Sequence, residues 1–283
     1  MNMNKPKNGC ILCNSNEYGI IFSYNEPDQY EKAVGVENKN YSRQWVKCKK
    51  CGFHYSVYSR DENILDKIYV SAYRSEKAPW RKGTSRYIFE KVIKLPENES
   101  ETKFRIKWIK SNINLMWDSK IVERNKAPYK MLDIGGATGV FAYEFKGKDW
   151  ISHVIDPNED GQFMQTYGVN FVQSYYEPKK FKYKFDLISL VYVLEHLRNP
   201  IPLLKNLHDD MTKNSFLYIE VPDAISFKLK PREDDIFNSC HLWMFDPQSM
   251  ITLLNKCGYQ AFCLSRMKTI REHYGLMILA GQK

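Results

Sequence analysis

The stretch KMLDIGGATGVF, residues 130–141, decides how the second half of this chain folds. It begins with an apolar run and ends in a cluster of three glycines, Gly135, Gly136 and Gly139. The apolar run predicts a buried strand. Glycine lets the backbone turn sharply and approach a ligand closely. The stretch therefore predicts a strand that turns into a helix beside a bound ligand.

The rest of residues 129–283 alternates between short apolar runs and helical segments. This alternation is typical of a parallel sheet with helices on both faces, so we expect an α/β, Rossmann-like fold. The helices should begin near residues 138, 159, 200 and 246, and the expected strands are KMLDIG (130–135), ISHVID (151–156), NFVQ (170–173), FDLISLVYV (185–193) and SFLYIEVP (215–222).

The chain ends in two further apolar runs, YQAFCLSRM (259–267) and HYGLMILAGQ (273–282), joined only by KTIRE. A connection this short cannot cross over to join parallel strands. The last two strands are therefore expected to form an antiparallel hairpin, which brings the predicted sheet to seven strands.

Four of the seven cysteines form two CxxC pairs separated by 34 residues: Cys10, Cys13, Cys48 and Cys51. Two thiolates spaced in this way reach one tetrahedral ion, and a glycine after the second pair suits the tight turn around the sulfurs. We predict a structural zinc ion with no open position, which stabilises a small domain and takes no part in catalysis. The alternative is four free thiols.

The positive charge is concentrated at the start of the chain. The formal net charge is +9, and residues 1–128 hold 24 Lys and Arg against 15 Asp and Glu, whereas residues 129–283 hold 18 of each kind. This bias favours an anionic partner, such as nucleic acid, a nucleotide-linked substrate or phosphate. The alternative is a solvated basic surface.

Length and composition indicate a globular protein. The chain has 283 residues, of which 43% are hydrophobic, enough for a sizeable core. The opening MNMNKPKNGC is polar, unlike a secretory signal, and no stretch is long and apolar enough to span a membrane. We therefore expect a cytoplasmic protein without a membrane span.

A helical region precedes the glycine motif. In FRIKWIKSNINLMW, apolar residues recur at helical spacing, which predicts an amphipathic helix that packs on the following domain: Ile106, Ile109, Ile113 and Met116. The predicted organisation is a zinc-ribbon-like module (1–60), a helical lid or linker (61–128) and an α/β domain (129–283).

The α/β part resembles the class I S-adenosylmethionine-dependent methyltransferases. Their first motif reads Asp/Glu-x-Gly-x-Gly-x-Gly, and this chain has DIGGATG, with Ala137 in place of the middle glycine. The resemblance implies that S-adenosyl-L-methionine lies against this turn. It implies the following cofactor-binding residues: Asp133, Gly135, Gly136, Ala137, Gly139, Asp156, Gln173, Ser174 and Val191.

Asp156 resembles the acidic residue that ends the second strand in this family. It lies in HVIDP, 17 residues after Gly139. A carboxylate there accepts hydrogen bonds from both ribose hydroxyls, a role that nicotinamide enzymes of similar topology share. The alternative is a loop aspartate. The C-terminal hairpin and the segment FDLISLVYVLEHLRNP favour S-adenosylmethionine over a dinucleotide.

Three features together are similar to bacterial methyltransferases of sugar and surface-polysaccharide modification. They are the N-terminal double CxxC, the LEHL element, and CHLWMFDPQSMITLLNKCGY. The resemblance implies methyl transfer to a hydroxyl of a small acceptor, either a sugar or a phosphorylated or nucleotide-linked sugar.

Glu195, His196 and His241 are the predicted catalytic residues. A hydroxyl acceptor must lose a proton, and Glu195 and His196 lie just past the carboxyl end of a predicted strand, where ligands bind in such sheets. His196 is the first candidate for the base and His241 the second. The alternative is that Glu195 and His196 only cap the turn before the helix near Pro200.

Two further groups are candidates for substrate contact. Residues 222–245 form a long connection, which favours a role in covering the substrate, and Trp243 in it either walls a pocket or simply packs. The basic residues Arg74, Arg81 and Arg86 either hold a phosphate of the acceptor or are solvated.

Other functions compete with sugar O-methylation. An RNA methyltransferase would use the zinc module and the basic N-terminal region as a nucleic-acid platform. The Asn/Asp-Pro-Pro-aromatic signature of enzymes that methylate base amines is missing from VYVLEH (191–196), which disfavours this function. C-methylation of a keto-sugar, N-methylation of an amino sugar and a catalytically idle binding protein stay open, and the sequence leaves the oligomeric state unknown.

Overall fold

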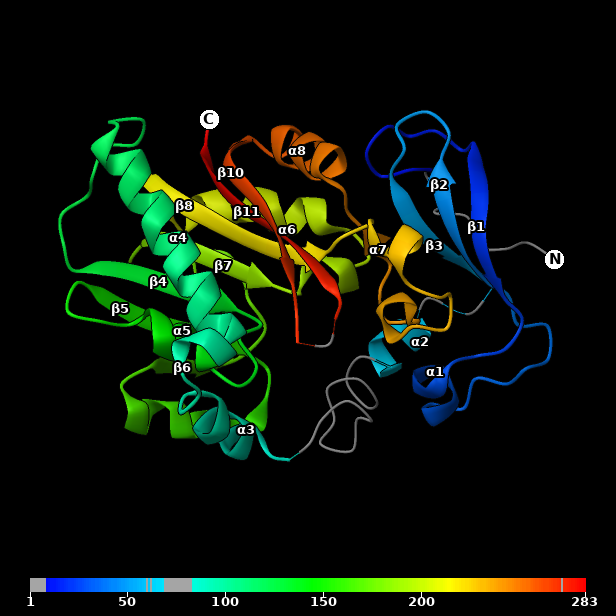
Figure 1. Ribbon diagram of the computed structural model, residues 1–283, viewed down its shortest axis with the longest axis horizontal. Helices are drawn as coiled ribbons and strands as arrows, with labels where there is room; N and C mark the ends of the chain where they lie inside the picture. Colours follow the sequence, from blue (N-terminus) through cyan, green and yellow to red (C-terminus); the bar gives the residue numbers. More distant parts are fainter. Residues whose placement is uncertain (1–8, 60, 62, 69–82, 271) are drawn as a thin grey trace.

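The computed structural model describes residues 9–59, 61, 63–68, 83–270 and 272–283. Figure 1 shows a large central sheet with the C-terminal hairpin at one edge and a smaller N-terminal sheet beside it. The strands and the turns that follow them hold many of the residues that the sequence marked as functional.

Within the described residues, the larger sheet has seven strands in the order β10-β11-β8-β7-β4-β5-β6. Strands β4 to β8 are parallel to one another, and β11 pairs antiparallel with both β8 and β10. The predicted Rossmann-like sheet and its C-terminal hairpin are therefore confirmed. The bounds are β4 Tyr129–Ile134, β5 Trp150–Asp156, β6 Asn170–Gln173, β7 Phe185–Val191, β8 Met211–Pro222, β10 Tyr259–Lys268 and β11 Tyr274–Gln282.

Helices cover both faces of this sheet, as predicted. On one face, Met131 of β4 shares a core with Ile109 and Phe145, and on the other face the next residue, Leu132, shares a core with Leu204 and Leu253. This alternation is that of a strand buried on both sides. The first face carries α4 Glu101–Asp118, α5 Val140–Phe145 and the 3-10 helix η3 Glu159–Tyr167, and the second carries α6 Pro200–Asn206 and α8 Pro247–Lys256.

Helix α4 has the predicted amphipathic character. All four apolar residues that set its expected buried face are buried: Ile106, Ile109, Ile113 and Met116. The helix lies along the sheet in Figure 1, as a layer of the fold, with α3 Ser85–Val92 and the 3-10 helix η2 Glu97–Glu99 before it. No helix among the described residues combines the length and apolar character that crossing a bilayer requires.

The N-terminal sheet takes one of its strands from the second half of the chain. In the part of the chain that is described, it has four antiparallel strands in the order β1-β2-β3-β9. Strand β9 belongs to the 222–245 segment that was expected to cover the substrate. The bounds are β1 Tyr18–Tyr24, β2 Arg43–Cys48, β3 His54–Tyr58 and β9 Trp243–Met244, with α1 Gln29–Ala33 between β1 and β2 and α2 Asn63–Lys67 after β3.

The two sheets share one hydrophobic core. Val46 and Phe53 of the N-terminal part belong to the same buried cluster as Leu204, Met250 and Leu253. Short elements connect the layers around this cluster: the 3-10 helices η4 Leu194–His196, η5 Leu207–Asp209 and η6 Asp235–Phe237, and α7 Ser226–Leu229. The N-terminal module is thus packed into the α/β part through a common interior.

Candidate active site

The glycine motif forms the turn between β4 and α5. Gly135 and Gly139 have φ angles of +73° and +75°, which favour glycine. Ala137 has a φ of +43°, so the alanine also adopts a left-handed conformation. A Cβ on Gly136 would lie 2.6 Å from Oδ2 of Asp133, which leaves no room for a side chain. The motif therefore makes the sharp strand-to-helix turn expected from its sequence.

Two buried carboxylates brace this turn. Asp156 ends β5 and accepts hydrogen bonds from the backbone N–H groups of Ala137 (2.9 Å) and Asn158 (2.8 Å). Asp133 accepts one from Ser189 Oγ at 2.7 Å. Burial raises the pKa of Asp133 to about 7, and the nearby charge of Asp156 adds to this shift. The two aspartates therefore shape the turn itself, and Asp156 has no exposed surface.

One cavity, here named cavity A, opens at the carboxyl ends of the parallel strands. Its volume is about 620 Å³, within the range of small-molecule sites. It is more apolar than polar in character, with Ile134, Ile155 and Leu203 in its wall. Its other lining residues include Gly135 of the turn, Pro157, Ser174, His196 and Asn199.

A second cavity, here named cavity B, lies on the other side of the glycine turn and has a volume of about 520 Å³. Thr138 of the turn and Val191 at the end of β7 belong to its wall. The remaining wall is rich in carboxylate, guanidinium, amide, hydroxyl and imidazole groups: Glu101, Arg105, Tyr192, Asp235, Asn238, His241, Thr269 and His273.

Glu195, His196 and His241 form a buried cluster at these cavities. One potential ligand atom from each of the three lies within 4.8 Å of the other two. His196 borders cavity A and His241 borders cavity B. The backbone joins the two segments as well, because Leu242 N–H donates to the carbonyl oxygen of Glu195 at 2.7 Å. The structure thus brings together the three residues predicted to be catalytic.

Burial dominates the electrostatics of this cluster. It raises the pKa of Glu195 well above its ordinary value, and the charge of Glu220 adds to the effect. It lowers the pKa of His241 to about 4, although the carbonyl of Ile236 and the charge of Asp235 act in the opposite direction. Without a compensating group, the cluster therefore favours the uncharged forms of its carboxyl and imidazole groups.

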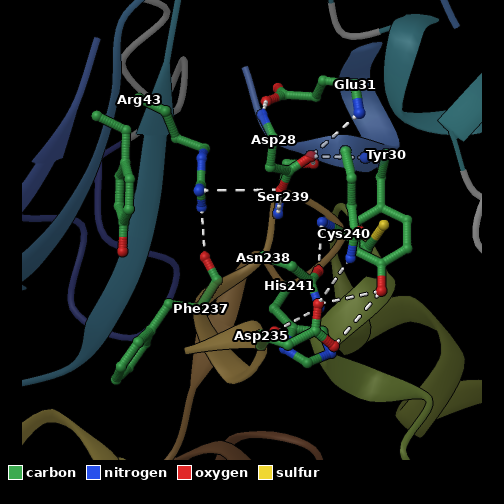
Figure 2. Close-up of polar contacts among 12 residues, drawn as sticks. Asp28, Tyr30, Glu31, Arg43, Asp235, Phe237, Asn238, Ser239, Cys240 and His241 are labelled. Carbon is green, nitrogen blue, oxygen red and sulfur yellow. Dashed lines mark hydrogen bonds and ion pairs between the residues drawn. The ribbon is translucent and has the colours of Figure 1, made fainter. Parts of the chain in front are cut away.

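The N-terminal part holds the segment that carries His241 (Figure 2). Arg43 donates to the carbonyl oxygen of Phe237 at 2.6 Å, and it lies 4.0 Å from Asp28. Asp28 accepts hydrogen bonds from the N–H (2.6 Å) and the hydroxyl (2.9 Å) of Ser239. Tyr30 donates to Asp235 at 3.1 Å. These contacts fix residues 235–241 from outside the α/β domain.

The four paired cysteines come together on two turns. The Sγ atoms of Cys10 and Cys51, and those of Cys13 and Cys48, are 3.5 Å apart, and all four lie within 4.8 Å of one another. A tetrahedron with Zn–S bonds of about 2.3 Å has edges of about 3.8 Å, so the donor set fits zinc. Although burial opposes it, the N–H groups at Cys51 and Lys50 lower the pKa of Cys48 to about 7.

The predicted cofactor residues divide into two groups. Gly135 and Ser174 line cavity A, and Val191 lines cavity B. The others frame the turn or the ends of the strands behind these cavities: Asp133, Gly136, Ala137, Gly139, Asp156 and Gln173.

The predicted substrate residues lie elsewhere. Arg74 and Arg81 lie outside the described residues. Arg86 is exposed on α3, where it bonds Glu90 at 2.8 Å, and it is not in the described wall of cavity A or B. Trp243 is buried on β9. Its indole N–H donates to the carbonyl oxygen of Leu197 at 2.6 Å, and its ring stacks on Phe53. The structure therefore places Trp243 in the packing between the two sheets.

Sequence reasoning missed Arg105. This residue lies on the buried side of α4 and lines cavity B, and its guanidinium bonds both carboxylate oxygens of Glu220, at 2.6 and 2.8 Å. Tyr218 also donates to Glu220, at 2.7 Å. The signal was present, because Arg105 precedes Ile109 by four residues on the apolar stripe. An arginine there needs a buried partner.

Comparisons with known proteins agree with this fold. A model of the family described as "Methyltransferase domain" matches residues 102–264, more than half of the chain. None of the curated proteins compared with the chain matches it.

Solved methyltransferase structures are also similar. For magnesium protoporphyrin IX methyltransferase from Synechocystis PCC 6803, identity is 12%, coverage is 79% of this chain and 100% of that chain, and the TM-score is 0.51. For 1,6-didemethyltoxoflavin-N1-methyltransferase from Burkholderia thailandensis, identity is 14%, coverage is 71% of this chain and 92% of that chain, and the TM-score is 0.47. At such low identity, the first of these supports the fold alone. The family match shows that the chain belongs to the methyltransferase-domain family and is a methyltransferase.

Proposed function

We propose that this methyltransferase moves the methyl group of S-adenosyl-L-methionine to a hydroxyl of a small sugar-based acceptor. The acceptor is a phosphorylated or nucleotide-linked sugar of surface-polysaccharide biosynthesis, as the sequence resemblance implies. The observation that carries the proposal is cavity B, which has many polar side chains in its wall, beside the buried cluster of Glu195, His196 and His241.

The glycine turn and cavity A support the choice of cofactor. A Cβ on Gly136 would clash with Asp133 and Val154, so only glycine fits this turn, and Gly135 brings bare backbone to the wall of cavity A. We assign the adenosine part to cavity A, with Ser174 at its rim, and a ribose contact to Asp156. A carboxylate has about four acceptor sites, so Asp156 can keep its two backbone hydrogen bonds and accept others from the ribose.

The size and lining of cavity B support a small, hydroxyl-rich acceptor. About 520 Å³ accommodates a sugar and is too small for a folded polymer. Asn238 and Thr269 supply amide and hydroxyl groups to its wall, the kinds of group that bond sugar hydroxyls. The arginine in the wall, Arg105, is already paired with Glu220, so cavity B does not present the basic surface that RNA binding requires.

The proposed catalytic groups are His196, Glu195 and His241. The donor supplies a methyl carbon that its sulfonium already activates, so the chain must position the acceptor, exclude water and allow its hydroxyl proton to leave. His196 Nδ1 lies 3.0 Å from the carbonyl oxygen of Cys240. Because a carbonyl only accepts, this contact places the proton on Nδ1 and leaves Nε2 as the basic nitrogen.

The test is a mass-spectrometric screen of labelled methyl transfer to nucleotide sugars, sugar phosphates and total RNA. We expect transfer to oxygen of a sugar acceptor, and a His196→Gln variant should lose about 100-fold or more of the rate. His208→Gln is the matched control, because His208 stacks on Tyr259 away from both cavities. Product on RNA alone would overturn the proposal, and product on a sugar carbon or amine would change the reaction class.

A further inference from the structure

The carboxylate of Glu195 lacks the partners that a buried charged group normally has. The side chain has no exposed surface, and neither of its oxygens accepts a hydrogen bond from a described residue. His196 Nε2 is 3.8 Å from Oε1, beyond hydrogen-bond distance. Glu220 adds negative charge nearby. Because unsatisfied buried carboxylates are costly, such a group indicates an additional ligand.

The two imidazoles next to it are oriented as metal ligands are. His196 Nδ1 bonds the carbonyl oxygen of Cys240 at 3.0 Å, and His241 Nδ1 bonds that of Ile236 at 2.8 Å. Metal-binding histidines almost always donate their other ring N–H to such an outer acceptor, which fixes the tautomer and the ring. The Nε2 atoms then carry the lone pairs.

The positions of the three side chains fit a single ion. One ligand atom from each lies within 4.8 Å of the other two. Ligand atoms around an ion with bonds of about 2.1 Å lie about 3.0 to 3.4 Å apart. Small rotations of the three side chains would bring their ligand atoms to these distances. The three ligands come from η4 and from the segment held by Asp28 and Arg43, two rigidly packed elements.

We propose that Glu195, His196 and His241 bind a divalent first-row transition-metal ion. Two imidazoles and one carboxylate suit ions such as Mn²⁺, Fe²⁺ and Zn²⁺ and leave coordination positions open. The ion lies between His196, which borders cavity A, and His241, which borders cavity B. It neutralises the buried carboxylate, and it is distinct from the zinc ion expected at the four cysteines.

The role of the ion rests on the proposed function. An open coordination position would bind the acceptor oxygen and lower the pKa of the hydroxyl, which a metal ion does without a free imidazole base. His196 is then a ligand. Metal dependence therefore distinguishes this arrangement from direct base catalysis by His196.

The experiment titrates Mn²⁺ into full-length protein that carries one zinc ion per chain, with the free Mn²⁺ measured by electron paramagnetic resonance. Thiolates favour zinc and oxygen ligands favour manganese, so Mn²⁺ reports on this cluster. We expect one bound Mn²⁺ per chain. Glu195→Gln and His241→Ala should each weaken binding at least 10-fold, whereas His208→Gln should bind as wild type does. Thermal unfolding of each variant confirms that it is folded.

Two outcomes overturn the inference: no Mn²⁺ uptake by the wild type, or uptake that Glu195→Gln and His241→Ala leave unchanged. The sugar assay separates it from the proposed function. Full-rate sugar methylation by protein that retains only the one zinc ion expected at the four cysteines would overturn the inference and leave the proposed function intact. Mn²⁺ binding that depends on Glu195, combined with no transfer to any sugar, would support the metal site and overturn the proposed function.

Discussion

The chain contains two clusters of potential metal ligands, and they are built in different ways. The four cysteines come from two short turns, each of which supplies a CxxC pair. Glu195 and His196 come from the tip of β7, whereas His241 comes from a distant segment that the N-terminal part holds in place. The first cluster is determined by local spacing, and the second exists only when the whole chain has folded.

The difference gives the N-terminal module a role in the second cluster. Strand β3 pairs with β9, and Ser56 N–H donates to the carbonyl oxygen of Leu242, the residue after His241, at 2.9 Å. Loss of the cysteine cluster should therefore disturb the histidine cluster, whereas the reverse effect should be small.

The largest effect is expected for Cys48→Ser. This change should abolish zinc binding, unfold the N-terminal sheet and reduce methyl transfer by about 100-fold or more, because a structural zinc contributes folding free energy directly. Elemental analysis and hydrogen exchange at Ser56 and Leu242 measure both consequences. Cys263→Ser, outside the CxxC pairs, is the matched control. A zinc-free Cys48→Ser protein with native exchange at Leu242 would break the proposed link.

Arg43→Met should have the next largest effect. Arg43 is 2% exposed and is paired with Asp28, and removing one partner of a buried pair costs about 3 to 5 kcal/mol. Urea unfolding measures the loss, and the zinc content should stay at one per chain. The double variant with Asp28→Ala should be less destabilised than the sum of the single changes. Strict additivity would show that the two residues act separately.

Asp156→Ala should weaken cofactor binding by about 1 to 3 kcal/mol, the contribution of hydrogen bonds to a charged group. Calorimetry with S-adenosylhomocysteine measures the affinity, and zinc content should be unchanged, since Asp156 bonds Ala137 and Asn158 and is no ligand of the zinc ion. Asp160→Ala is the control, because Asp160 is exposed nearby on η3. Unchanged affinity, or tight NAD binding, would contradict the assignment.

The smallest effect concerns His54, which lies between the two clusters opposite Met244. Burial lowers its pKa to about 4, Lys47 lowers it further, and Asp246 opposes this. Because the folded pKa is below the unfolded one, the unfolded chain binds the proton first, and stability falls as the pH drops from about 6.5 toward 4.

We expect His54 to account for about 1 kcal/mol of the stability lost between pH 7 and 5.5. In His54→Phe, which keeps an aromatic ring against Phe227, that part of the loss should disappear. Urea unfolding at the two pH values provides the measurement. An equal loss in both proteins would assign the pH dependence to other groups.

Local patterns explain why so much of the fold could be predicted. Alternating apolar runs gave the parallel strands, the short KTIRE connection gave the hairpin, and the spacing of Ile106 to Met116 gave the buried face of α4. The CxxC spacing likewise predicted that the four cysteines lie close together. Each of these signals depends on residues that are close in sequence.

The features that could not be predicted depend on long-range contacts. The pairing of β9 with β3 has no local signature, because a two-residue strand shows no periodicity. The Arg105 and Glu220 pair joins a helix to a strand more than one hundred residues later. Trp243 was expected as a candidate for substrate contact, but its burial depends on Phe53 in the other half of the chain.

Strand β9 also has a consequence for the order in which the protein folds during synthesis. Translation proceeds from the N-terminus, and domains generally fold as they emerge. The first three strands of the N-terminal sheet leave the ribosome early, but β3 keeps an unpaired edge until residues 243–244 are made. Such edges pair readily with other chains. The nascent protein therefore carries an open strand edge through most of its translation, and the last third of the chain closes it.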